Sequence, residues 1–135
     1  MMVLVDTSIL IDYFKGKRHE KIDQFDMILS HKIPFGISAY TYQELLQGAR
    51  NEREFSLLKE YLASQTIYML PEAVETYEEA AKLYFEARRK GVTPRGTIDL
   101  LIAYTCLYYN LPLLHNDRDF DALAKIFPQL KIWMG

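Results

Sequence analysis

Short apolar runs alternate with longer stretches along the chain. Each run is too short for a helix of ordinary length and is bounded by polar residues or Pro, which favours buried strands. The predicted strands are Met2–Val5, Ile33–Ser38, Thr66–Leu70, Leu111–His115 and Leu130–Trp133.

Between these runs, apolar residues recur at the three- and four-residue spacing of amphipathic helices. The first predicted helix is capped by Thr7 or Ser8, runs to about Phe14 and is ended by Gly16. Further helices are predicted over 19–31, 40–48, 52–62, 72–90, 97–109 and 119–127. The alternation predicts an α/β fold with a central parallel sheet of four to five short strands and helices on both faces. The length, 135 residues, suits a single domain over 1–135.

The overall composition narrows the function less than the pattern does. The net charge of −2 gives the whole molecule no attraction for nucleic acid, so a polyanion would need a local basic patch or a metal ion. Cys106 is the only cysteine, which leaves no internal disulfide and no cysteine zinc site. No apolar stretch is long enough for a bilayer, so no membrane association is expected. These features favour a cytoplasmic location.

Four acidic residues stand in unusual surroundings. Asp6 follows the first strand, and Asp117 lies just past the fourth; Glu44 and Asp99 lie in predicted helices. Functional sites of parallel sheets lie at the carboxyl ends of strands, so Asp6 and Asp117 share one crevice if their strands are neighbours. Asp99 lies on the same helical stripe as Ile102, Ala103 and Cys106, which turns it inward. Converging carboxylates repel unless a cation binds, and oxygen ligands suit Mg²⁺ or Mn²⁺.

Each acid also has a purely structural interpretation. Asp6 could accept hydrogen bonds from the helix that follows it, and Glu44 could form a capping box with Thr41. Asp99 could stabilise the first turn of its helix, and Asp117 could form an Asx turn or an N-cap. The convergence of all four is what favours a metal site.

Four segments, in order, resemble the PIN-domain ribonucleases and, within them, the VapC-type toxins of toxin–antitoxin pairs. The segments are MVLVDTSILIDYF, GISAYTYQELLQGA, GTIDLLIAYTC and LPLLHNDRDFDALAKI. The likeness covers nearly the whole chain. It implies one PIN domain acting as a divalent-metal-dependent endoribonuclease with Mg²⁺ or Mn²⁺ as cofactor.

The resemblance also assigns residues. Asp6, Glu44 and Asp99 match the acidic core of the family, with Asp6 and Asp99 as the direct metal ligands and Glu44 and Asp117 as further candidates. The late acid of the family stands at Asp117 or at Asp119; Asp117 is preferred. Supporting roles next to the ligands then fall to Asp119, Thr7 and Asn116. His115 stands where relatives often have Thr, and is interpreted as a satisfied residue at a strand end rather than a proton carrier.

The expected partners are an RNA substrate, a VapB-type antitoxin and a second copy of the chain. Candidate RNA-binding cations are Arg95, Lys15 and Arg50, with Arg95 preferred because it is close in sequence to Asp99. The resemblance implies that the hairpin Tyr40–Leu62 forms part of the antitoxin groove.

Two other classes of protein were weighed. A receiver domain or a haloacid-type phosphatase needs further acids at its strand ends, and Asp6-Thr7-Ser8 does not supply them. A catalytically inactive PIN-like module that binds RNA or protein remains the alternative, and incubation with RNA and Mn²⁺ separates binding from cutting.

Overall fold

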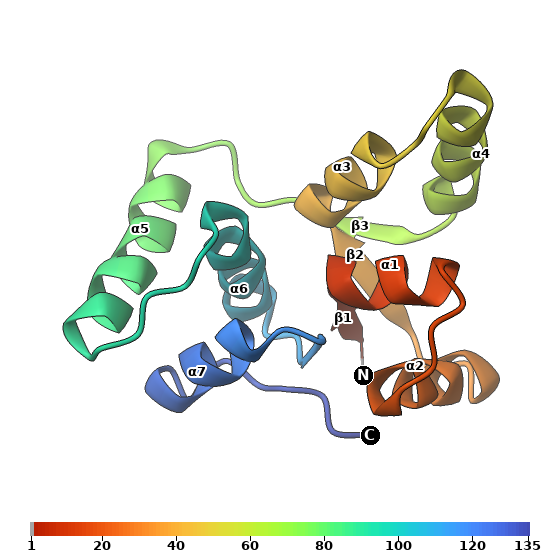
Figure 1. Cartoon of the computed structure of the whole chain (residues 1–135). Coiled ribbons are helices and arrows are strands. Elements are labelled where there is room, and N and C mark those ends of the chain that lie inside the picture. Colours follow the sequence, from red (N-terminus) through yellow and green to blue (C-terminus); the bar gives the residue numbers. More distant parts are fainter. Residues whose placement is uncertain (1) are drawn as a thin grey trace.

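The computed structural model describes residues 2–135 and contains a four-stranded parallel sheet in the order β3-β2-β1-β4 (Figure 1). The strands are β1 (Val3–Val5), β2 (Phe35–Ser38), β3 (Thr66–Tyr68) and β4 (Leu113–Leu114). The predicted α/β class and parallel sheet are confirmed.

Seven helices connect or follow the strands in the described part of the chain. They are α1 (Thr7–Phe14), α2 (Glu20–Ser30), α3 (Ala39–Gln47), α4 (Glu52–Ala63), α5 (Val74–Arg89), α6 (Thr97–Tyr109) and α7 (Arg118–Ile126). In Figure 1, α1 to α4 lie on one side of β1 and α5 to α7 on the other. None of the described helices is long and apolar enough to span a bilayer.

The core lies in two layers, one on each face of the sheet. Val3 and Val5 pack with apolar residues of α1 and α2, whereas Leu4 packs with residues of α6 and α7. All three side chains of β1 are fully buried because successive residues of a strand point to opposite faces, and helices cover both. This explains why the strand is an unbroken apolar run.

The last predicted strand, Leu130–Trp133, is reduced to one parallel bridge between Leu113 and Ile132. The backbone of Leu113 accepts from the Trp133 amide at 2.8 Å and donates to the Lys131 carbonyl at 2.9 Å. The segment therefore extends the edge of the sheet beside β4, over a length too short for a strand.

The caps at the starts of α1 and α3 differ from those suggested by the sequence. Asp6, and not Thr7 or Ser8, is the N-cap of α1. Ser38 is the N-cap of α3 and accepts from the Thr41 amide at 3.0 Å, so Thr41 and Glu44 do not form a capping box. Both starts precede the predicted positions, because Asp and Ser are equally good caps and apolar spacing does not distinguish them.

Candidate metal centre

The ends of β1 and β4 lie next to each other. Val5 is paired with Leu114, and the Asp6 amide donates to the Leu114 carbonyl at 2.9 Å. Asp6 and Asp117 therefore follow neighbouring parallel strands, which is the condition for the two residues to share one crevice.

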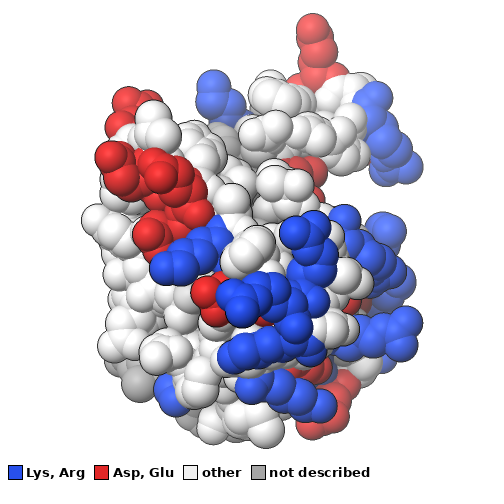
Figure 2. All heavy atoms as spheres, turned by 90° about the vertical axis from the view of Figure 1, so that its left-hand side faces the viewer, with Lys and Arg blue, Asp and Glu red and all other residues white. Residues whose placement is uncertain are grey.

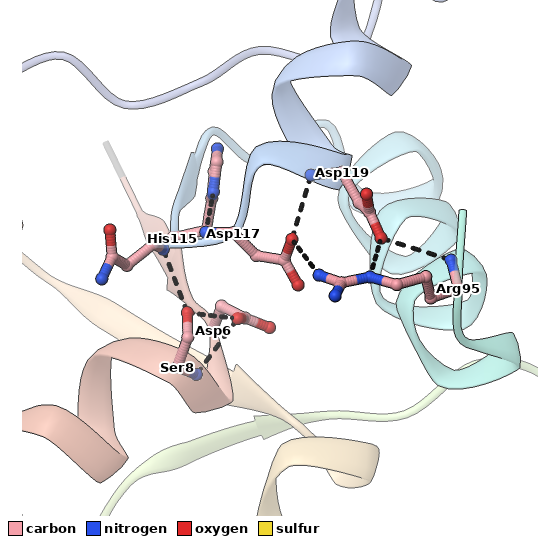
Figure 3. A network of polar contacts seen from close by, with 7 residues as sticks. Asp6, Ser8, Arg95, His115, Asp117 and Asp119 are labelled. Carbon is pink, nitrogen blue, oxygen red and sulfur yellow. Dashed lines mark hydrogen bonds and ion pairs between the residues drawn. The ribbon is translucent and has the colours of Figure 1, made fainter. Parts of the chain in front are cut away.

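Asp6 is held in place by the first turn of α1. Its Oδ2 accepts from the Ser8 amide at 3.1 Å and from the Ser8 hydroxyl at 2.6 Å (Figure 3). Ser8 Oγ in turn accepts from the Asn116 amide at 3.0 Å, which ties the segment after β4 to α1. Burial raises the pKa of Asp6, and the bonds from Ser8 oppose that rise. The structural interpretation of Asp6, as a cap of the following helix, is correct and leaves Oδ1 free of these bonds.

Three carboxylates come together at the amino ends of two helices. Asp99 lies in the first turn of α6; Asp117 is the N-cap of α7, accepting from the Asp119 amide at 3.0 Å; and Asp119 is in the first turn of α7. One carboxylate oxygen from each lies within 4.8 Å of the others. We call these three residues the acidic cluster. Hard divalent cations take ligands of this kind.

Asp6 and Glu44 lie outside the acidic cluster but are close enough to affect it. Burial raises the pKa of Asp99 to about 6, and the charges of Asp6, Asp117, Asp119 and Glu44 contribute to the rise. The four acids chosen from the sequence thus share one electrostatic environment. Among these charges that of Asp6, the predicted ligand partner of Asp99, contributes most to the rise, and Asp117 and Asp119 follow.

Arg95 reaches the acidic cluster from the loop between α5 and α6. Its guanidinium lies 3.7 Å from Asp117 Oδ1 and 3.4 Å from Asp119 Oδ2, and its amide donates to the same Asp119 oxygen at 3.2 Å (Figure 3). Within residues 2–135, Asp99 forms no ion pair with a cationic side chain. One arginine thus partners two of three carboxylates, and the remaining negative charge fits a divalent ion.

Glu44 is positioned by a chain of hydroxyl groups. Thr7 Oγ1 donates to Glu44 Oε1 at 2.7 Å and lies 2.9 Å from Thr41 Oγ1. Ser38 Oγ continues the chain by donating to Thr41 Oγ1 at 3.2 Å. Because the single proton of Thr7 goes to the carboxylate, Thr41 donates to Thr7, and each hydroxyl of the chain has a partner.

His115 is fully buried and bonded through both ring nitrogens. Nδ1 accepts from the Asp117 amide at 3.0 Å, so Nε2 carries the proton and donates to Asp121 at 3.1 Å. Burial lowers the pKa of His115 and keeps the ring neutral. These contacts support the structural interpretation of this residue, because no nitrogen is left to carry a proton to substrate.

The remaining predicted residues occupy two other places. The side-chain nitrogen of Asn116 lies 3.4 Å from Asp12 Oδ2 and so points away from the acidic cluster. Asn116 acts on the site through its backbone amide, which donates to Ser8 Oγ. Lys15 and Arg50 line a groove between α1, α3 and α4, at which Glu44 also lies, and Arg50 is paired with Glu54.

The sequence interpretation gave Ser8 and Ser38 no role in the site, although Ser8 holds Asp6 and Ser38 continues the hydroxyl chain to Glu44. The signals were present, since Ser8 belongs to the Asp-Thr-Ser turn, and Ser38, Thr41 and Glu44 are spaced three residues apart. Such spacing places side chains along one face of a helix.

Comparisons with known proteins identify the family and the fold. The sequence model of the PIN domain matches residues 3–126. The chain is 28% identical over 126 residues to ribonuclease VapC11 of Mycobacterium tuberculosis, covering 93% of each protein. It superposes on a chain of VapBC2 from Rickettsia felis, solved with a promoter DNA fragment, with a TM-score of 0.73, 22% identity and 98% of each chain covered. For VapBC-1 from nontypeable Haemophilus influenzae, the TM-score is 0.69 and the identity 26%, over 98% of this chain and 97% of the other.

The match to the family model covers the strands, the helices and the acidic residues described above. The chain therefore belongs to the PIN-domain family.

Proposed function

We propose that this chain is a divalent-metal-dependent endoribonuclease and the toxin of a VapBC-type toxin–antitoxin pair. The observation that carries the proposal is the acidic cluster, whose three carboxylate oxygens lie within 4.8 Å of one another at the carboxyl edge of the sheet. The relatives described above include a named VapC ribonuclease of nearly the same length.

In this proposal, Asp6 and Asp99 are the direct ligands of the ion, and Glu44 and Asp117 are further candidate ligands. Asp119 lies beside Asp99 and Asp117 in the acidic cluster and supports them. Oxygen-only ligands favour Mg²⁺ or Mn²⁺ over zinc. When bound, such an ion supplies positive charge at the scissile phosphate and acidifies the attacking water.

The other residues of the site hold the carboxylates and the RNA. Ser8 fixes one oxygen of Asp6, and Thr7 fixes one oxygen of Glu44, so neither carboxylate has to be ordered when substrate arrives. The exposed guanidinium of Arg95 can exchange its carboxylate partners for an RNA phosphate, which places a cation beside the cleaved bond.

Cleavage of RNA by the purified chain tests the proposal. With Mn²⁺ or Mg²⁺ the chain should cut RNA internally, EDTA should stop it, and Asp99→Asn should abolish cutting while the protein stays folded. Asp23→Asn, a matched change on the exposed face of α2, should cut like the wild type. A chain that binds RNA and never cuts it would instead be the inactive module.

The partner is proposed from the groove lined by α1, α3 and α4. It has a volume of about 1190 Å³ and presents exposed apolar side chains from α1 and α4, among them Phe14, Leu57 and Tyr61. A groove of this kind suits an amphipathic helix of a VapB-type antitoxin. Glu44 lies at the groove, so a basic side chain of the bound helix could reach the acids and displace the ion.

Expression in cells tests the toxin role. When the chain is induced in the cytoplasm of a host, the cells should stop growing and their RNA should show one dominant new 5′ end. Co-expression of the antitoxin should restore growth and prevent the cleavage. A homodimer is part of the same proposal, and sedimentation of the purified chain tests it.

A further inference from the structure

A second cavity lies between α5 and α6, beside the acidic cluster. Its volume is about 450 Å³, within the range of roughly 300–1,000 Å³ typical of ligand pockets. Its walls come from α5, from the loop before α6 and from the first turns of α6; the wall residues used below are Tyr77, Ala81, Tyr84, Arg95, Gly96 and Thr97.

Two residues of one loop separate this cavity from the acidic cluster. Arg95 lines the cavity and also contacts Asp117 and Asp119. Gly96 lines it too, and a Cβ atom at Gly96 would lie 3.5 Å from Asp99 Oδ2. When an RNA strand is bound at the acidic cluster, its neighbouring nucleotide is therefore within reach of the cavity.

The walls of the cavity combine two tyrosines and two leucines with small residues, Pro94 and one cation, Arg95, and none of the lining residues is acidic. Tyr77 is 61% exposed, and the guanidinium of Arg88 lies 5.7 Å from the ring centre of Tyr84. Aromatic rings near an arginine suit stacking of a nucleobase. The N-terminus of α6, at Gly96, has no side-chain cap, so amide donors of its first turn remain for the edge of a base.

The surface around the cavity carries charges of both signs, in separate patches. Figure 2 shows Lys and Arg side chains gathered on the face that carries α5, with acidic side chains collected at its upper left. The sequence of α5 shows the same division: exposed Glu75, Glu78 and Glu79 flank Tyr77 in its amino-terminal half, whereas its carboxyl end carries exposed Arg88 and Arg89, followed by exposed Lys90. Cations here can follow the phosphates of a strand while a base enters the cavity.

We propose that this cavity receives one base of the RNA substrate, next to the phosphate at the acidic cluster. The inference rests on the proposed ribonuclease function and adds a specificity-determining subsite to it. Tyr77 and Tyr84 stack on the base, and Thr97 and the first turn of α6 contact its edge. The cavity thereby selects which nucleotide flanks the cleaved bond.

Steady-state cleavage of a short oligoribonucleotide in Mn²⁺ tests the inference. A pool of single-stranded sequences first yields one that the wild type cuts. The same RNA is then made with an abasic ribose on either side of the cleaved bond. One of the two abasic RNAs should lose about tenfold in kcat/KM, because stacking of one base is worth roughly that factor.

Variants of the cavity connect this loss to its walls. Tyr77→Ala should raise KM for the intact RNA about tenfold with kcat nearly unchanged, and should lose less than twofold on the sensitive abasic RNA. Ala81→Leu, which fills the cavity from an exposed helix position, should also raise KM. Tyr108→Ala is the matched control, because Tyr108 is 51% exposed and does not line the cavity.

The possible results separate the two proposals. If the wild type cuts no RNA in Mn²⁺, the ribonuclease function and this subsite are both refuted. If it cuts the intact and both abasic RNAs equally well, or if Tyr77→Ala behaves like Tyr108→Ala, the subsite is wrong and the ribonuclease function stands.

Discussion

Replacing Asp99 by Asn should inactivate the protein and at the same time stabilise it in the absence of metal. The pKa of Asp99 rises from 3.8 to about 6 because of burial and the charges of Asp6, Asp117, Asp119 and Glu44. A group whose pKa is raised in the folded state destabilises that state once it ionises. Asn keeps the shape of the side chain and removes the charge.

The magnitude follows from the size of that rise. A shift of about two pKa units corresponds to about 3 kcal/mol at neutral pH. Asp99 is only partly buried, and solvent screening reduces the value to about 1.5 kcal/mol. The free energy of unfolding should therefore be about 1.5 kcal/mol higher for Asp99→Asn at pH 7.5 in EDTA. The gain should be about half as large at pH 5 and nearly absent near pH 4, since wild-type Asp99 is then protonated.

Urea unfolding followed by circular dichroism measures this difference. Mn²⁺ should stabilise the wild type and have little effect on Asp99→Asn, because binding to the native state adds to its stability. Asp23→Asn, on the exposed face of α2, should show no gain at any pH. Equal stability of Asp99→Asn and the wild type at pH 7.5, or a gain that does not shrink at low pH, would refute the electrostatic account of the site.

Three further changes test other parts of the site. Thr7→Val should lower the free energy of unfolding by about 1–3 kcal/mol and reduce RNA cleavage, because it removes the donor that holds Glu44. Urea unfolding and a cleavage assay measure the two effects, and an unchanged rate of RNA cleavage would contradict this role of Thr7. His115→Leu should cost about 1–3 kcal/mol at pH 7.5, because it leaves the partly buried Asp117 amide without its acceptor. Because burial lowers the pKa of His115, the stabilisation by the neutral ring is present above pH ~6.5 and is lost as the pH falls. Urea titrations at pH 7.5 and 5.5 check both statements. Arg95→Ala should weaken RNA binding and reduce the slope of log affinity against log salt by about 1, measured by fluorescence anisotropy; an unchanged slope would remove Arg95 from the phosphate contacts.

Much of the fold follows from the apolar pattern of the chain. The run Val3-Leu4-Val5 predicts a strand buried on both faces, and the structure covers it with helices on both. The shared crevice of Asp6 and Asp117 depended on strand order, which sequence periodicity does not encode. The pairing of Val5 with Leu114 supplies that missing condition.

The sequence pattern does not determine features that depend on how distant segments meet in space. Leu130–Trp133 has the composition of a strand, yet only Ile132 bridges to Leu113, because a strand needs a longer paired edge than two-residue β4 offers. The sequence left the late acid open between Asp117 and Asp119, and the structure brings both beside Asp99 at the amino ends of α6 and α7. Tyr77 and Tyr84 were given no role in the site, because aromatic residues on one helix do not reveal a cavity formed with the next helix.

The groove is built by α1, α3 and α4 and the second cavity by α5 and α6, two sets of helices that lie on opposite sides of β1 in Figure 1. A helix seated in the groove thus leaves the base subsite uncovered. An RNA strand can wait there, anchored by its base, while the catalytic acids are blocked, so the first cut after the inhibitor departs needs no new encounter with substrate.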